Sequence, residues 1–77
     1  MTPQEIGAIA RERRRELSLR QLELAQLSEV SERFIRDLES GKPGMRLDKL
    51  IAVLGVLGFD LTVEAHVSEV LQGRSHE

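Results

Sequence analysis

The chain has 77 residues, a formal net charge of −2 and no cysteine. A chain of this length forms one domain with a marginal core of its own, so dimerisation is an ordinary source of further stability. The lack of cysteine excludes disulfides, thiolate metal sites and thiol nucleophiles. No signal peptide and no long apolar run are present, which predicts a cytoplasmic protein with no membrane partner.

The charge is distributed unevenly. Residues 1–46 hold nine Lys or Arg and eight Asp or Glu, a net of +1, whereas residues 47–77 hold two and five, a net of −3; together they make −2. A negative total is unusual for a DNA-binding domain, which usually carries a basic surface. The distribution still allows the N-terminal part to face phosphates, with an affinity that depends strongly on salt.

The first element is a helix predicted over residues 3–16. Thr2 and Glu5 form a capping-box pattern, and Pro3 suits the first helical position. A run of arginines supplies charge around this helix, and a solvated surface is the simplest interpretation of it. The run consists of Arg11, Arg13, Arg14 and Arg15.

A shorter second helix follows. Ser18 with Gln21 is one capping pattern for its start, and a start closer to Arg20 is the alternative. Leu24 and Ala25 are spaced to pack inward. Residues 28–31 then give a turn too short for two antiparallel helices, which predicts a steep crossing, as in a helix-turn-helix whose second helix enters a major groove.

The third helix, predicted over residues 31–40, has two faces of different chemistry. Positions taken at about 100° intervals place the apolar side chains of Phe34, Ile35 and Leu38 together. The opposite side is polar and consists of Glu32, Arg33, Arg36, Asp37 and Ser40. Phe34 lies at the border of the two faces, where core packing is favoured over contact with a thymine methyl group.

The polar face suits the edges of bases. Arg33 and Arg36 can donate to guanine or to a phosphate, while Glu32 and Asp37 can accept from cytosine. The alternative for Glu32 and Arg36, four residues apart, is an ion pair with each other. Gly41 suits the position after the helix. The loop that follows has a cation at each end, suited to backbone phosphates: Lys42 and Arg46.

A fourth helix is predicted from residue 47 to about residue 58. Its apolar stripe is wider than one small core needs, so part of it is expected to meet a second subunit. Gly55 weakens this helix by about 1 kcal/mol relative to alanine, which a close helix–helix approach would explain. The stripe consists of Leu47, Leu50, Ile51, Leu54 and Gly58, broadened by Val53, Val56 and Leu57.

Residues 59–67 alternate apolar and polar side chains, which is typical of a half-buried strand. No second strand is predicted in the chain, so the expected partner is the same strand of another copy across a two-fold axis. The organisation is thus a DNA-binding domain over residues 1–58, a dimerisation strand over residues 59–67 and a flexible tail over residues 68–77. The predicted dimer contacts are Leu54, Leu57, Phe59, Leu61, Val63 and Ala65.

The run from residue 21 to residue 42 resembles the Xre/Cro-type helix-turn-helix repressors, whose pattern is roughly Q-x-x-L-A-x-x-x-G-V-S-x-x-x-I-x-x-x-E-x-G-K. Glu29 departs from it, because the family has glycine there for a left-handed residue, and a side chain costs about 1 kcal/mol. The resemblance implies a mainly α, lambda-repressor-like bundle of four to five helices, with the C-terminal strand pairing across a homodimer. The matches are Gln21, Leu24, Ala25, Val30, Ser31, Ile35, Glu39, Gly41 and Lys42.

The resemblance also implies roles for single residues. Arg14 would pair with Glu39 and tie the first helix to the third, a structural role. Gln21 would donate to a phosphate, at a helix start whose N–H groups favour anions. The whole predicted DNA-binding set is Gln21, Ser31, Glu32, Arg33, Arg36, Asp37, Lys42 and Arg46.

The C-terminal part of the chain resembles one subgroup of this family. The run KPGMRLDKLIAVLGVLGFDLTV looks like the end of HipB-type antitoxins, and the similarity spans residues 6–66. It implies a HipA-type kinase toxin as partner and repression of the chain's own operon. The alternatives are a phage-type repressor without a toxin, and a dimeric protein-interaction module whose helix-turn-helix is vestigial. No nucleophile, metal cluster or phosphate loop is present, so no enzyme, cofactor or metal is predicted.

Overall fold

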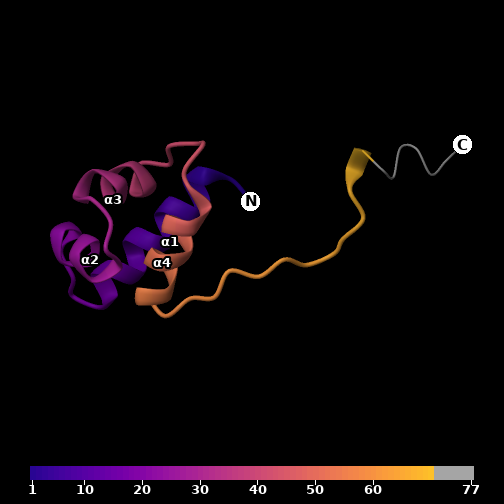
Figure 1. Ribbon diagram of the computed structural model, residues 1–77. Coiled ribbons are helices and arrows are strands. Elements are labelled where there is room, and N and C mark those ends of the chain that lie inside the picture. Colours follow the sequence, from indigo (N-terminus) through magenta and orange to yellow (C-terminus); the bar gives the residue numbers. More distant parts are fainter. Residues whose placement is uncertain (71–77) are drawn as a thin grey trace, which may run out of the picture.

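The computed structural model describes residues 1–70, which hold four helices in the order α1 (Pro3–Glu16), α2 (Gln21–Ser28), α3 (Glu32–Glu39) and α4 (Leu47–Val56). The helices form a small bundle, and the chain after α4 leads away from it (Figure 1). The prediction of a mainly α helix-turn-helix bundle is confirmed. None of the helices in this part of the chain is long and apolar enough to cross a bilayer.

Local sequence signals account for where α1 and α2 begin. Thr2 Oγ1 accepts from the Glu5 N–H at 3.1 Å, with Pro3 at the first helical position. At α2 the Arg20 N–H donates to the Glu23 carboxylate at 2.9 Å. The start near Arg20 is therefore confirmed, and the alternative start at Ser18 is wrong. Ser18 instead ends the preceding helix in the left-handed region, with a φ of 57°.

The turn between α2 and α3 has the conformation that the sequence predicts. Glu29 is left-handed, with φ 58° and ψ 40°, although it carries a side chain. Its conformation lets the Val30 N–H donate back to the Ala25 carbonyl at 3.0 Å. Ser31 then caps α3 by accepting from the Phe34 N–H at 3.0 Å. The motif is thus complete, at the cost of strain at one residue.

The core lies where the four helices meet. Its buried side chains are apolar: Ala10, Leu24, Ala25, Ile35, Leu38, Val53 and Leu57. α1 and α3 approach closely at Gly7, where a Cβ atom would overlap the Leu38 carbonyl oxygen. The hydrogen at Gly7 therefore sets the distance between α1 and the helix that carries the polar face.

The structure places the stripe of α4 differently from the prediction. Leu57, predicted at a dimer surface, is fully buried in the core of its own chain, and Leu54 is 7 % exposed. The large apolar side chains that α4 leaves exposed are Leu47 and Ile51, at 60 % and 49 %. The single-chain core needs the C-terminal turn of α4, and sequence periodicity does not say which part of a wide stripe fills it.

No strand is formed in residues 1–70, so the predicted strand over residues 59–67 is absent from the single chain. The physical reason is that a strand needs a partner for its N–H and C=O groups. Phe59 still packs against the core, and the Arg13 guanidinium lies 5.9 Å from its ring centre. Beyond it Val63 is 98 % exposed. Most of the predicted tail, residues 71–77, lies outside the described residues.

Candidate nucleic-acid interface

α3 lies at the end of the bundle away from the C-terminal segment (Figure 1), and its outer side is polar. Ile35 and Leu38 are buried on its inner side. The predicted readout residues all lie on the outer side, where Ser31, Arg33 and Arg36 are exposed and Glu32 and Asp37 are half-buried. The structure therefore brings these five predicted site residues together on one face.

Each cation on this face has a carboxylate nearby. Arg36 Nη1 lies 3.7 Å from Glu32 Oε1, Arg33 Nε lies 4.0 Å from Asp37 Oδ2, and Lys42 Nζ lies 3.4 Å from the same Asp37 oxygen. The alternative of an ion pair between Glu32 and Arg36 is therefore present. Exposed pairs of this kind contribute about 0–1 kcal/mol each, so a base or a phosphate can replace one of the partners at low cost.

Ser31, which precedes α3, and Phe34, which lies within it, each have a structural role as well. The hydroxyl oxygen of Ser31 accepts the capping bond, which leaves its hydrogen available as a donor. Phe34 packs against the core, and the Lys49 ammonium lies 6.0 Å from its ring centre. Phe34 thus has the core role that its border position favours.

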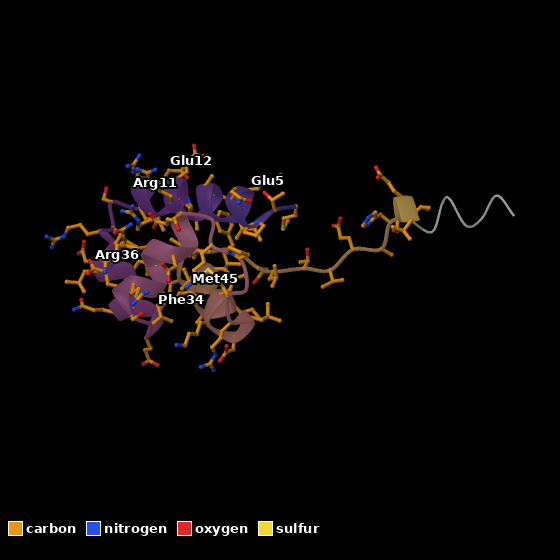
Figure 2. The ribbon with its side chains drawn as sticks, turned by 90° about the horizontal axis from the view of Figure 1, so that it is seen from above. Glu5, Arg11, Glu12, Phe34, Arg36 and Met45 are labelled. Carbon is orange, nitrogen blue, oxygen red and sulfur yellow. The ribbon has the colours of Figure 1, made fainter. Side chains whose placement is uncertain are left out.

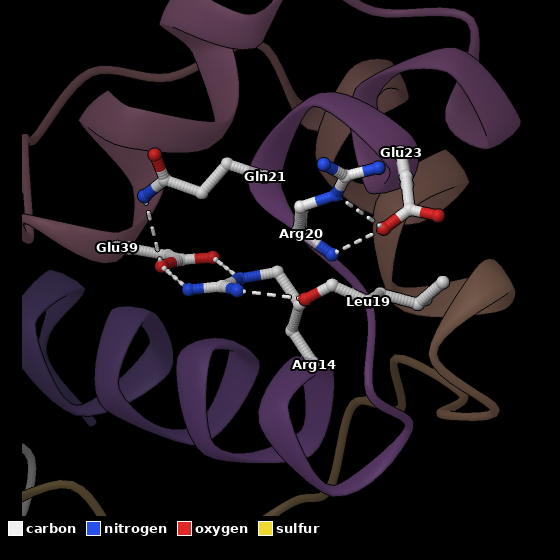
Figure 3. Close-up of polar contacts among 6 residues, drawn as sticks. All are labelled: Arg14, Leu19, Arg20, Gln21, Glu23 and Glu39. Atoms are coloured by element: carbon white, nitrogen blue, oxygen red, sulfur yellow. Dashed lines mark hydrogen bonds and ion pairs between the residues drawn. The ribbon is translucent and has the colours of Figure 1, made fainter.

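A buried polar network fixes α3 to α1 and α2 (Figure 3). Arg14 donates from Nε and Nη2 to the two Glu39 carboxylate oxygens at 2.7 and 2.9 Å, and from Nη1 to the Leu19 carbonyl at 2.8 Å. The side chains of Arg14 and Glu39 are only 11 % and 4 % exposed. The hydrogen bond to Glu39 raises the pKa of Arg14 above its ordinary value. The pair that the resemblance implied therefore has short, paired bonds.

Gln21, predicted as a phosphate donor, belongs to the same network. It is the first residue of α2, and its Nε2 donates to Glu39 Oε1 at 3.2 Å. That bond uses one of its two amide hydrogens, so the second remains available to a phosphate. Gln21 is thus held in place by a residue 18 positions away.

The loop cations are also compensated. Arg46 donates to both carboxylate oxygens of Asp48, at 3.1 and 2.7 Å. The hydrogen bonds from Arg46 lower the pKa of Asp48, although both side chains are exposed. The sequence prediction for Arg46 missed this partner, and the signal that indicates it is the position of Asp48 just inside α4. The charge of Arg46 is therefore largely balanced by its neighbour in the loop.

Two arginines of α1 lie beside the polar face, a position that the sequence analysis does not predict. Arg11 and Arg15 line a hollow that is also lined by Arg36 of α3 and by Ser40, the residue after α3. The run of four arginines and two glutamates along residues 11–16 does not indicate which arginines face α3. Among the described residues, no cluster of three or more His, Cys, Asp or Glu side chains could hold a metal ion.

Residues 11–63 match the helix-turn-helix family. The chain is also 47 % identical, over 64 residues, to a protein of Sinorhizobium fredii (strain NBRC 101917 / NGR234) named "Uncharacterized HTH-type transcriptional regulator y4mF". The match covers 83 % of this chain and 84 % of that relative. The span of the family match includes α2, the turn at Glu29 and the polar face of α3. The chain therefore belongs to the helix-turn-helix family.

Proposed function

We propose that the protein is a sequence-specific DNA-binding regulator of transcription that inserts α3 into the major groove. The observation that carries this proposal is the polar outer face of α3 on a helix whose inner side is buried and whose end is tied down by the Arg14–Glu39 pair. Such rigid support is what base readout requires. The relative named as a transcriptional regulator supports the same function.

In this proposal the residues divide by task. Arg33 and Arg36 donate to guanine edges, and Glu32 and Asp37 accept from cytosine or orient the arginines beside them. Ser31 and Gln21 donate to phosphates near the starts of α3 and α2. Lys42 and Arg46 contact phosphates from the loop. The phosphate contacts thus position the protein on the DNA, and the base contacts determine which sequence it prefers.

The dimer is part of the proposal. Residues 59–67 would pair with the same segment of a second copy and so gain the partner strand that a single chain lacks. An apolar hollow of about 140 Å³ at the root of the segment, lined in part by Ile9, Leu54, Phe59 and Leu61, supplies a surface for that packing. Two such subunits would place two α3 helices about one helical turn apart on a pseudo-palindrome.

Alternation within the segment provides a matched test of the dimer. Val63→Glu places a charge on the apolar face and should shift the sedimentation coefficient from dimer to monomer. Thr62→Glu adds the same charge on the opposite face, where the dimer should tolerate it. A wild-type monomer, or equal effects of the two variants, would contradict strand pairing.

The finer proposal is that this regulator is an antitoxin that binds a HipA-type kinase toxin and represses their shared operon. Its support is the resemblance of residues 42–63 to the end of HipB-type antitoxins. The test is co-expression with a kinase-like protein encoded next to the gene, followed by purification of the complex. If no gene for a kinase-like protein lies next to the gene for this chain, a phage-type repressor is favoured instead.

One observation favours a different class. Arg33, Arg36, Lys42 and Arg46 all have carboxylates within 4.0 Å, so the face of α3 has little net charge to attract DNA. A protein-interaction module with a vestigial helix-turn-helix would have such a face. This second candidate predicts partner binding with no preference for any DNA sequence.

An anisotropy titration separates these candidates. The purified protein is titrated against its own upstream DNA and against unrelated DNA, each at two salt concentrations. A regulator should bind the upstream DNA at least about tenfold tighter, equal to about 1.4 kcal/mol. Arg33→Ala should then cost about 1–3 kcal/mol on upstream DNA, while Lys42→Ala weakens both DNAs alike. Equal or absent wild-type binding to both DNAs would favour the interaction module.

A further inference from the structure

A hollow of about 410 Å³ lies between α1 and α3, beside the polar face. Arginine side chains dominate its lining, and we call it the arginine hollow. Arg14 and Glu39 neutralise each other there and are its least exposed pair. The remaining charges are cationic and come from both helices: Arg11 and Arg15 of α1 and Arg36 of α3, next to Ser40.

Two of these cations have no anionic partner among the residues that the structure describes. No carboxylate of residues 1–70 lies within 4.0 Å of Arg11 or Arg15, whereas the arginines of α3 and of the loop all have one. Arg11 and Arg15 are exposed and stand four residues apart on α1, where like charges repel each other. An anion bound in the hollow would relieve this repulsion.

The arginine hollow is continuous with the proposed DNA-binding face. Arg36 belongs to both, and Gln21, the first residue of α2, also lines the hollow. Arg11 and Arg36 lie at the end of the bundle away from the C-terminal segment (Figure 2). An anion in the hollow therefore lies beside whatever α3 contacts, which favours a polyanion such as the DNA backbone over an isolated ion.

We propose that Arg11 and Arg15, with Arg36 and Ser40, bind a phosphodiester of the DNA backbone that flanks the bases read by α3. Guanidinium groups suit this ligand because their N–H donors pair with two phosphate oxygens at once. The inference rests on the proposed function and adds to it a phosphate clamp on α1. It also replaces the interpretation of Arg11 and Arg15 as a merely solvated surface.

The first test uses a short random-sequence duplex, so that it does not depend on an operator. The affinities of the wild type and of R11Q/R15Q are measured over a series of salt concentrations. The slope of log affinity against log salt should be less steep for R11Q/R15Q than for the wild type. The difference should be about 0.9 for each phosphate contact that the variant has lost. R11K/R15K keeps the charges and should keep the slope. R11K/R15K should melt like the wild type, and R11Q/R15Q should melt no lower than the wild type, because neither arginine has a carboxylate partner in the described residues and the variant removes the repulsion between them.

The second test locates the phosphate. Single uncharged methylphosphonates are placed along each strand of the upstream duplex. At one position the methylphosphonate should weaken binding by the wild type but leave the affinity of R11Q/R15Q unchanged. At all other positions the two proteins should change in affinity by the same factor. The ratio of affinities for upstream and random DNA should stay the same in R11Q/R15Q, in contrast to Arg33→Ala.

The outcomes separate this inference from the proposed function. An unchanged salt slope in R11Q/R15Q, or identical methylphosphonate profiles, would overturn the phosphate clamp and leave the regulator intact. A reduced slope without wild-type preference for upstream DNA would support the clamp and contradict sequence-specific regulation. A wild type that binds no duplex at all would overturn both.

Discussion

Arg14 and Glu39 are 25 residues apart, yet two parallel hydrogen bonds of 2.7 and 2.9 Å join them inside the bundle. Through this pair α1 holds the C-terminal end of α3, and Gln21 adds a bond from α2 to the same carboxylate at 3.2 Å. The orientation of the polar face of α3 therefore depends on a network that does not itself read bases.

Glu39→Gln should destabilise the fold, because it leaves the Arg14 charge without its anion in a nearly buried position. Loss of one partner of a buried pair costs about 3–5 kcal/mol, and somewhat less where the side chains keep some exposure, as here; urea denaturation followed by circular dichroism would measure the loss. Asp48→Asn makes the same chemical change in the exposed pair with Arg46 and should leave the midpoint nearly unchanged. Equal effects of the two substitutions would show that the buried pair has no special role.

Glu29→Gly should stabilise the protein. The left-handed conformation at φ 58° strains any residue with a Cβ atom, and glycine relieves that strain by about 1 kcal/mol. For a domain of this size the melting temperature should rise by about 4–8 °C. Glu29→Ala is the control, since it removes the carboxylate but keeps the Cβ atom. A rise of the same size in Glu29→Ala would indicate that charge, and not backbone strain, limits stability there.

Two helical glycines should respond to alanine in opposite directions. Gly7→Ala forces α1 away from the Leu38 carbonyl and should cost about 1–3 kcal/mol. Gly55→Ala meets no atom within 4 Å and should stabilise α4 by about 0.5–1 kcal/mol. Thermal melts of the two variants check both signs. Weaker dimerisation of Gly55→Ala would instead support the close helix–helix approach that the sequence suggests at this position.

The start of α2 should depend on pH. The backbone N–H of Arg20 donates to the Glu23 carboxylate, and the Arg20 side chain donates to it as well. Both bonds lower the pKa of Glu23 from its ordinary value of 4.5, and the backbone bond has the larger effect. A lowered folded-state pKa means that this contribution is present above pH 4.5 and is lost as the pH falls through the lower folded value. A carboxyl NMR titration of Glu23 checks the direction, and Glu23→Gln should remove the change in the Arg20 amide proton chemical shift that accompanies this titration. A Glu23 pKa above 4.5 would exclude the cap.

Sequence reasoning predicted the features that depend on neighbours along the chain. The cap at Thr2 and the two faces of α3 follow from local backbone chemistry and helical period, and the left-handed conformation at Glu29 follows from the resemblance to helix-turn-helix repressors. Where two local signals competed, as at Ser18 and Arg20, the sequence left the choice open. The carboxylate of Glu23 decided it, because it reaches back to the Arg20 N–H.

The sequence by itself thus determined the four helices, the turn and the polar face, since each depends on residues only a few positions apart. Tertiary structure alone decided that Leu57 fills the core of its own chain, that Gln21 is held by Glu39, and that Arg11 and Arg15 lie beside Arg36. The physical reason is that these relations depend on how whole helices are rotated and packed against one another, which the period of a single helix does not specify. For residues 59–67 the pairing depends on a further chain, because a strand forms its hydrogen bonds with another strand.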